Sequence, residues 1–365
     1  MFKLIMLGSV AVVGAGLFLA YKGKMRSLTG PSLEKYDRDL KPDFHVDPDS
    51  KPMKVIDEYL EENFVKPAVS AAAKSGWDAK RKRFDQAGLR RTDLKAEYRE
   101  DVVEMDGVSV PGRWTLVKGY DPDKRILYYH GGAFTAGSDI SHRAISVNLA
   151  KRTKAAIFVP NYRLMPENPR SAPIEDAKAC YKWILENGPD GPAPVRTFAV
   201  SGDSAGGNLT HMIANWSRDQ GLRQADAIYT LSPNTDATAS AKSFKSNLGK
   251  DKMLSPLIGP LLKIPRPLLL MGMKKQIGFA PCDPQVSPVF ADLSNLPPTL
   301  IQASTDELLR DDCIRFATKL EEAESPVTLQ LWDHVPHVFQ IFDDVLPAST
   351  VALDLAGKFL NTHLS

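Results

Sequence analysis

The stretch Gly202-Asp203-Ser204-Ala205-Gly206-Gly207 decides how this chain folds. It fits the pattern G-x-S-x-G and follows residues 195–200, whose Val, Phe and Ala side chains are typical of a strand. The apolar periodicity of residues 208–218 predicts a helix soon after it. A serine at such a junction lies on a strained turn with its hydroxyl exposed, and the glycines are needed because larger side chains would clash. The motif therefore predicts that Ser204 is a nucleophile.

A plain glycine-rich turn or a phosphate-binding loop is the alternative interpretation of this motif. A Walker-type phosphate loop requires a lysine after its last glycine, whereas Asn208 stands there in this chain. The strand–turn–helix setting consequently favours the nucleophile.

Short apolar runs alternate with helical patterns on both sides of the motif. Residues 96–105 and 108–118 flank Asp106-Gly107, a dipeptide suited to a tight hairpin turn. A helix is expected at residues 172–187, and further strands at residues 125–129, 155–159, 227–231, 299–303 and 327–331. This alternation predicts an α/β fold with a mainly parallel central sheet covered by helices on both faces.

A second glycine-rich stretch, His130-Gly131-Gly132-Ala133-Phe134, ends the predicted strand 125–129. Backbone N–H groups are suitable donors for the negatively charged oxygen that forms during acyl transfer, and glycines leave those groups unshielded. The amides of Gly131, Gly132 and Ala133 are therefore predicted to form an oxyanion hole, together with the Ala205 amide after the nucleophile. His130 itself is expected to support this loop.

A serine hydroxyl becomes nucleophilic only when a base takes its proton, and a histidine is the natural base. The chain has seven histidines, and the order serine, acid, histidine that this class of fold uses leaves His334, His337 and His363. His363 is the third residue from the end, in a tail that is expected to be solvated. His337, in Pro336-His337-Val338-Phe339 after the strand 327–331, is the predicted base, with His334 as a neighbour.

The carboxylate that orients this histidine is expected just after the strand 299–303. Asp306 is the first carboxylate beyond that strand and is predicted to take this role, with Glu307 as the alternative. Asp311 and Asp312 are expected to flank the following helix.

Two acidic residues are expected to support the site without reacting. Glu167 ends the stretch Asn161-Tyr162-Arg163-Leu164-Met165-Pro166-Glu167, which is interpreted as a loop of buried ion pairs. Asp203 precedes the predicted nucleophile directly.

The composition excludes several classes of function. The 365 residues include 46 Lys and Arg against 44 Asp and Glu, and this balance does not favour nucleic-acid binding. Three widely spaced cysteines form no disulfide scaffold and show no zinc-ligand spacing. Neither a metal nor an organic cofactor is expected.

The first residues differ from the rest of the chain. Residues 4–21 contain no charged side chain, and as a helix they would span about 27 Å, enough to cross a bilayer core. Residues 1–26 are therefore predicted to be an uncleaved, single-pass membrane anchor. A cleavable signal peptide is the alternative, which bulky Phe18 before a cut at Ala20 disfavours. Lys22, Lys24 and Arg26 after the segment favour a cytosolic main domain.

The motifs, in the order His130–Phe134, Tyr162–Glu167, Gly202–Gly207, Asp306–Leu309 and Pro336–Phe339, resemble those of the hormone-sensitive-lipase-like serine carboxylesterases. The resemblance implies an α/β-hydrolase catalytic domain over residues 96–365 and a triad of Ser204, Asp306 and His337. It also implies a helical cap formed by residues 27–95 and part of residues 233–290. Family members usually carry a third glycine where this chain has Ala133.

The same resemblance implies hydrolysis of carboxylic esters of small to medium lipophilic substrates through an acyl-enzyme. A lactonase, an amide deacetylase or a lipase would use the same triad, and a catalytically silent binding protein would typically lack one of its members. Whether exposed apolar cap surface serves membrane docking or homodimer formation stays open at this level.

Overall fold

The computed structural model describes residues 22–66, 76–89 and 91–365. The predicted anchor at residues 4–21 lies outside this range. Among the described helices, none combines the length and the apolar character needed to cross a bilayer.

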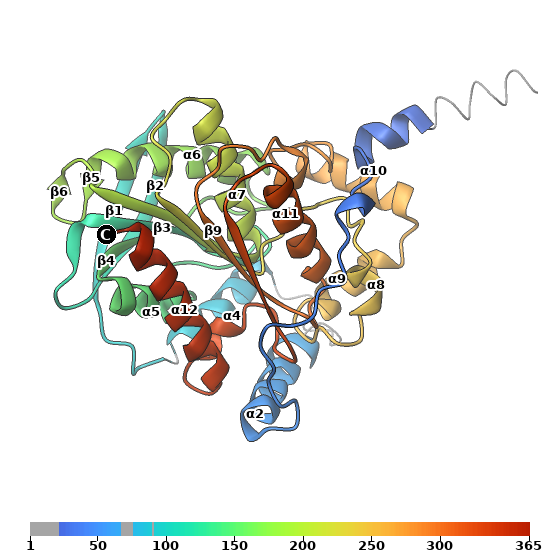
Figure 1. Cartoon of the computed structure of the whole chain (residues 1–365), viewed down its shortest axis with the longest axis horizontal. Helices are drawn as coiled ribbons and strands as arrows, with labels where there is room; N and C mark the ends of the chain where they lie inside the picture. The colour runs from blue at the N-terminus through green and yellow to red at the C-terminus, as the bar shows by residue number, and fades with distance from the viewer. Residues whose placement is uncertain (1–21, 67–75, 90) are drawn as a thin grey trace, which may run out of the picture.

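An eight-stranded sheet forms the centre of the molecule, in the order β1-β2-β4-β3-β7-β8-β9-β10 (Figure 1). The pairs β1–β2 and β2–β4 are antiparallel, and the remaining pairs are parallel. The strands are β1 Glu97–Met105, β2 Val108–Leu116, β3 Asp121–Tyr129, β4 Ala155–Pro160, β7 Thr197–Asp203, β8 Ala227–Leu231, β9 Thr299–Ser304 and β10 Val327–Trp332. A separate two-stranded pair joins β5 Asn187–Gly188 and β6 Gly191–Pro192. The predicted mainly parallel sheet is confirmed.

Helices cover both faces of the sheet because its strands bury both sets of alternating side chains. On β3, Ile126 and Tyr128 join a core cluster with α5 Arg143–Thr153 and α12 Pro347–His363. Leu127 and Tyr129 face the other way and pack with α6 Ser171–Glu186 and α7 Ser204–Asp219. The helix α11 Arg310–Glu322 packs on β9 and β10 on this second face.

The hairpin between β1 and β2 turns at the predicted dipeptide. Asp106 and Gly107 have φ angles of 52° and 78°, and Met105 pairs with Val108 across the turn. Two successive residues with positive φ give the twist that joins adjacent antiparallel strands. Asp106-Gly107 therefore sets the register of this edge of the sheet.

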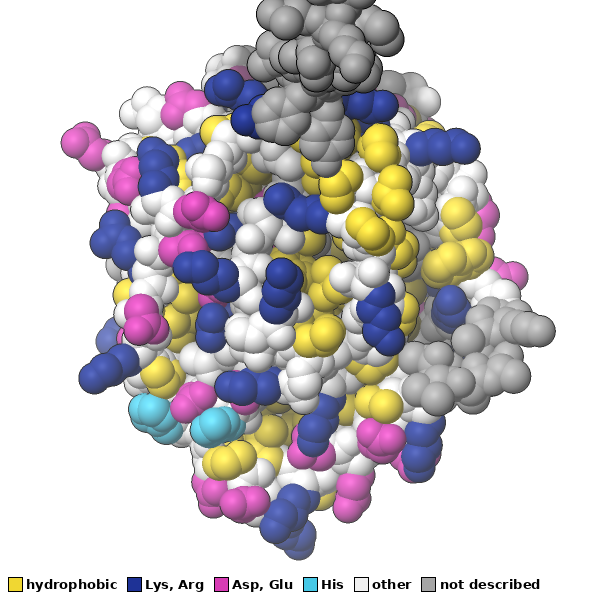
Figure 2. Space-filling model, turned by 90° about the vertical axis from the view of Figure 1, so that its right-hand side faces the viewer, with side chains coloured by type: hydrophobic (Ala, Val, Ile, Leu, Met, Phe, Trp, Pro, Cys, Tyr) yellow, Lys and Arg dark blue, Asp and Glu magenta, His cyan; other side chains and the backbone are white. Residues whose placement is uncertain are grey.

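Two segments outside the sheet supply further helices. The N-terminal part contains η1 Glu34–Tyr36, α2 Lys51–Leu60 with a π-helical continuation η2 Glu61–Val65, and α4 Trp77–Leu89. Between β8 and β9 lie α8 Ser243–Ser246, α9 Ser255–Leu262, α10 Arg266–Ile277 and η4 Pro288–Phe290, and η5 Phe339–Phe342 follows β10. Helices α8–α10 lie together at one end of the molecule, and Figure 2 shows that end.

The helix predicted to start at residue 208 begins at Ser204. Glycine has low helix propensity, so the sequence pattern did not predict that the first turn, which contains Gly206 and Gly207, is helical. Gly206 lies in that first turn against β3, and a Cβ atom there would lie 1.9 Å from the Tyr129 carbonyl oxygen. The glycine is thus required by the close approach of α7 to the sheet.

We expect Gly206→Ala to destabilise the protein by about 3 kcal/mol, because the added methyl overlaps rigid backbone. The matched control is Gly272→Ala on α10, where a Cβ meets nothing within 4 Å. That change should stabilise the protein by about 0.5–1 kcal/mol through helix propensity. Urea unfolding measures both, and equal midpoints for the two variants would contradict the described packing.

Candidate active site

Ser204 lies at the tight junction between β7 and α7. Its φ angle is 52°, a left-handed conformation that costs free energy for a residue with a side chain. Ser204 is partly exposed, whereas Asp203 and Ala205 on either side are buried. A Cβ atom at Gly202 would lie 2.6 Å from the Gly206 carbonyl oxygen, so the turn tolerates only glycine there. The junction thus presents the Ser204 side chain, as the sequence motif indicates.

The sheet topology brings the other predicted residues to the same edge. Strands β7, β8, β9 and β10 are parallel neighbours, so their carboxyl ends meet along one side of the sheet. Ser204 follows β7, Glu307 follows β9 and His337 follows β10.

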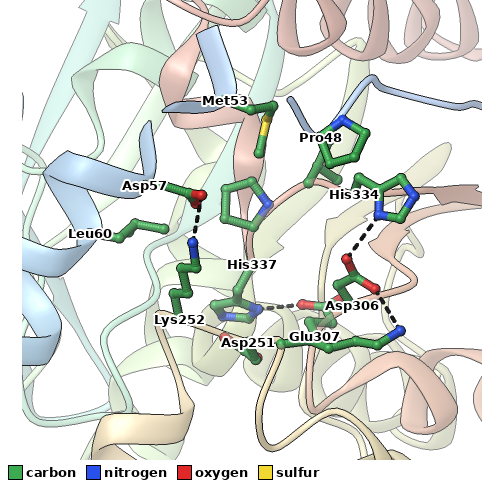
Figure 3. A pocket seen from close by; sticks show the side chains of 13 residues that line it. Pro48, Met53, Asp57, Leu60, Asp251, Lys252, Asp306, Glu307, His334 and His337 are labelled. Atoms are coloured by element: carbon green, nitrogen blue, oxygen red, sulfur yellow. Dashed lines mark hydrogen bonds and ion pairs between the residues drawn. The ribbon is translucent and has the colours of Figure 1, made fainter. Parts of the chain in front are cut away.

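His337 is held by Glu307 and not by the predicted Asp306. The Nδ1 atom of His337 lies 2.5 Å from Oε2 of Glu307, and both side chains are buried (Figure 3). The other carboxylate oxygen of Glu307 accepts a hydrogen bond from the Ser304 N–H at 2.9 Å. Glu307 is therefore fixed in place by the end of β9 itself.

Asp306 faces outward and binds two different partners. Its carboxylate lies 3.4 Å from His334 Nδ1 and 3.3 Å from Lys250 Nζ. Asp306, the first carboxylate after β9, is the one that the sequence predicts as the partner of His337. The loop instead turns Glu307 inward, because Leu308 and Leu309 beside it are buried in a hydrophobic cluster. The assignment of Asp306 as partner of His337 is corrected to Glu307.

The environment of His337 favours its protonated form. Burial lowers the pKa of this imidazole, but the hydrogen bond and charge of Glu307 and the nearby carboxylate of Asp251 outweigh burial and raise the pKa above its ordinary value. A buried carboxylate thus stabilises the imidazolium that forms when His337 accepts a proton.

The segment before α9 holds the loop that carries Glu307. Asn247 donates hydrogen bonds to the carbonyl oxygens of Thr305 and Glu307, both at 2.8 Å. Asp251 accepts the Leu308 N–H at 2.8 Å, and burial raises the pKa of Asp251. The sequence analysis missed Asn247 and Asp251, because no motif or periodicity marks them within residues 233–290.

Of the three loop amides predicted to bind an oxyanion, one is already hydrogen-bonded within the protein. The Gly131 N–H donates to Oδ1 of Asp203 at 2.9 Å, so the prediction that Gly131 serves as an oxyanion donor is corrected. Gly132 and Ala133 have φ angles of 113° and 54°, and within the described chain their N–H groups have no hydrogen-bond partner. Ala205 lies in the first turn of α7, where backbone N–H groups lack intrahelical acceptors.

Buried polar side chains support this loop from below. Besides Gly131, Oδ1 of Asp203 accepts the Tyr128 hydroxyl at 2.6 Å and lies 3.3 Å from Nε2 of His142. Burial opposes the charge of Asp203, but His142 and Tyr128 outweigh it and lower the pKa of that carboxyl.

His130 packs beside Asp203 as a neutral ring. It stacks on Tyr162 with the centroids 4.2 Å apart, and burial lowers the pKa of His130 to about 3. Its Nδ1 atom lies 2.8 Å from the Gly131 carbonyl oxygen, so the neutral ring supports the loop by stacking and by a hydrogen bond.

Helix α4 holds the same loop from outside the sheet. Arg81 donates to Glu167 Oε2 at 2.6 Å, and this charge lowers the pKa of Glu167. The same guanidinium donates to the carbonyl oxygens of Thr135 and Met165, each at 3.0 Å. Arg81 therefore joins the Gly132 turn to the stretch that ends at Glu167. The sequence pattern around residue 81 carried no signal for this contact.

A pocket lies beside His337 and Glu307 (Figure 3). Met53, Asp57 and Leu60 of α2 line one side, and residues 250–252 line another. Lys252 Nζ lies 2.5 Å from Asp57 Oδ2 and joins these two sides. The N-terminal segment and the segment between β8 and β9 thus enclose the pocket together.

One group of described side chains has the spacing of potential metal ligands. Oxygen and nitrogen atoms of Asp306, Asp333 and His334 lie within 4.8 Å of one another. All three side chains are partly exposed, and Lys250 already pairs with Asp306.

A family model described as alpha/beta hydrolase fold matches residues 126–341. The chain belongs to this family. An acetyl-hydrolase of Streptomyces hygroscopicus is 33% identical over 66% of this chain and 76% of its own length. An esterase of Acinetobacter venetianus is 33% identical over 64% of this chain and 73% of its own length.

The structural neighbours agree with this family. The crystal structure of an esterase from the bacterial hormone-sensitive lipase family superimposes with a TM-score of 0.73, at 29% identity, over 87% of this chain and 99% of that one. The resemblance inferred from the motifs is confirmed, and by family and structure the chain is a hydrolase of the carboxylesterase type.

We expect Glu307→Gln to lower the pKa of His337, because the variant removes the charge that opposes burial. Asp306→Asn is the matched control and should leave that pKa nearly unchanged. A titration of the His337 ring by NMR measures both. A larger effect of Asp306→Asn than of Glu307→Gln would show that Asp306, as the sequence predicts, is the carboxylate that orients His337.

Proposed function

We propose that this protein hydrolyses carboxylic esters through a triad of Ser204, Glu307 and His337. The observation that supports it is the buried hydrogen bond between His337 and Glu307, at the sheet edge that also presents Ser204 on a left-handed turn. Nucleophile, base and orienting acid follow three strands of one parallel array, in the chain order typical of this fold.

The proposed reaction has two halves. His337 accepts the hydroxyl proton as Ser204 Oγ attacks the ester carbonyl, and Glu307 stabilises the resulting imidazolium. The N–H groups of Gly132, Ala133 and Ala205 donate to the oxyanion of the tetrahedral intermediate. His337 returns the proton to the departing alcohol. Water, deprotonated by His337, then attacks the acyl-enzyme; the bond between the acyl carbon and Ser204 Oγ breaks, His337 returns the proton to Oγ, and the acid is released.

The walls of the pocket favour esters of small to medium lipophilic substrates. Met53, Leu60 and Val335 provide apolar surface next to His337, and Pro48 and Pro336 add to it. Charged side chains, among them Asp57, Asp251 and Lys252, line the same pocket, so in this proposal the apolar side chains contact only the hydrocarbon part of the ester. In this proposal residues 27–95 and part of residues 233–290 act as the cap over the site.

We expect Ser204→Ala to lower kcat by about 10⁶-fold and Glu307→Gln by about 10⁴-fold, since both act within the triad. Asp306→Asn, next to Glu307 but facing outward, should change kcat by about twofold at most. Hydrolysis of p-nitrophenyl esters from acetyl to long acyl chains measures these rates and the acyl preference.

Circular dichroism should show native folding for all three variants. Near-normal turnover in folded Ser204→Ala, or a loss in Asp306→Asn equal to that in Glu307→Gln, would overturn the triad.

The pH profile should reflect the raised pKa of His337. The base acts only when it is neutral, so kcat/KM should fall as the pH drops through this pKa, with a midpoint above the ordinary value of 6.5. In Glu307→Gln the midpoint should move to lower pH. A wild-type midpoint below 6.5 would contradict the described environment.

A further inference from the structure

Exposed hydrophobic side chains gather on α9 and α10. Of the ten large hydrophobic side chains that are exposed in the described residues, five lie between Leu248 and Leu268. Leu257, Leu261, Ile264 and Leu268 are 52%, 49%, 41% and 56% exposed. Side chains of this kind are normally scattered singly, so a concentration on two consecutive helices indicates a surface that meets an apolar phase.

Helix α9 is apolar on both sides, and only one side has a partner among the described residues. Ile258 and Leu262, with Leu254 just before the helix, pack on the cluster that contains Phe244 and Leu308. Leu257 and Leu261 lie on another face and stay exposed. A surface helix with a second apolar stripe differs from an ordinary amphipathic helix, whose outer face is polar.

The charged side chains of this segment of the chain all have one sign. Residues 252–282 contain five Lys and Arg and no Asp or Glu. Lys252 pairs with Asp57, whereas Lys263, Arg266, Lys274 and Lys275 are exposed. No ion pair joins these four to a carboxylate of the described chain. Figure 2 shows hydrophobic side chains interspersed with Lys and Arg over this face.

The start of the described chain adds basic residues at the same place. Residues 22–29 are helical, and buried Leu28 and the contact of Cys282 Sγ with the Ser27 carbonyl oxygen at 3.4 Å hold them beside the end of α10 (Figure 1). Lys22, Lys24 and Arg26 are exposed there. Basic side chains therefore lie on the segment that carries the exposed leucines and again beside the end of α10.

We propose that this α9–α10 surface, formed by Leu257, Leu261, Ile264 and Leu268 with Lys263, Arg266, Lys274 and Lys275, docks on a bilayer that contains anionic lipids. Aliphatic side chains enter the boundary between headgroups and acyl chains, and the basic side chains bind lipid phosphates and carboxylates. A second copy of the chain fits less well, because a symmetric contact would place basic residues against basic residues. The proposal does not depend on the catalytic assignment.

The test uses full-length protein with an environment-sensitive fluorophore attached through Leu261→Cys, in a Cys282→Ser background. The matched control carries the same fluorophore through Val351→Cys on α12, a site that is 46% exposed. Each protein is mixed with phosphatidylcholine vesicles, with or without phosphatidylserine. Emission wavelength and quenching by lipids brominated in their acyl chains report whether each site enters the bilayer.

We expect a blue shift and bromolipid quenching at position 261 on phosphatidylserine-containing vesicles, and neither at position 351. The triple change Lys263→Gln, Lys274→Gln and Lys275→Gln should weaken docking by about fivefold per lysine. An aqueous spectrum at position 261 on anionic vesicles would overturn the proposal. A blue shift that grows with protein concentration without lipid would overturn it in favour of self-association, and equal shifts on neutral and anionic vesicles would overturn the role of charge.

Discussion

The buried carboxylate of Asp203 joins the two glycine-rich segments on which the site is built. It accepts hydrogen bonds from the Gly131 N–H and the Tyr128 hydroxyl and lies against His142. A buried charge is stable only when its hydrogen bonds are satisfied. Replacing one of these partners would therefore destabilise the protein as replacing the carboxylate would. A Cβ atom at Gly131 would lie 2.0 Å from an Asp203 oxygen, which explains why the loop needs glycine there. The Ser204 turn and the loop that begins at Gly131 consequently form one unit.

Segments outside the sheet stabilise both the glycine-rich loop after β3 and the loop that carries Glu307. Arg81 on α4 binds the turn that follows Gly132, and Asn247 and Asp251 bind the loop that carries Glu307. Residues before the sheet and between β8 and β9 therefore hold the loops that carry the proposed oxyanion donors and the proposed acid. A change in these segments is expected to alter the geometry of catalysis as well as the access of substrate.

Sequence patterns predicted the strands, the hairpin turn and the positions of Ser204 and His337 on the sheet edge, because each rests on local periodicity or turn chemistry. The same patterns could not identify the carboxylate that contacts His337, because two adjacent acidic residues were candidates. Asp306 and Glu307 both follow β9, and their order along the chain says nothing about which one faces His337. The predicted role of Gly131 failed for a related reason, since its amide is taken by Asp203, a residue 72 positions away.

By itself, the sequence determined the α/β architecture, the tight turn at Ser204 and the glycine-rich loop, since strand period, glycine spacing and motif order are properties of short segments. Only the tertiary structure decided which carboxylate orients His337, which amides stay unpaired and which leucines of α9 remain exposed. These outcomes depend on contacts between segments far apart in the chain, and the burial of Leu308 and Leu309 beside Glu307 is what turns that carboxylate inward.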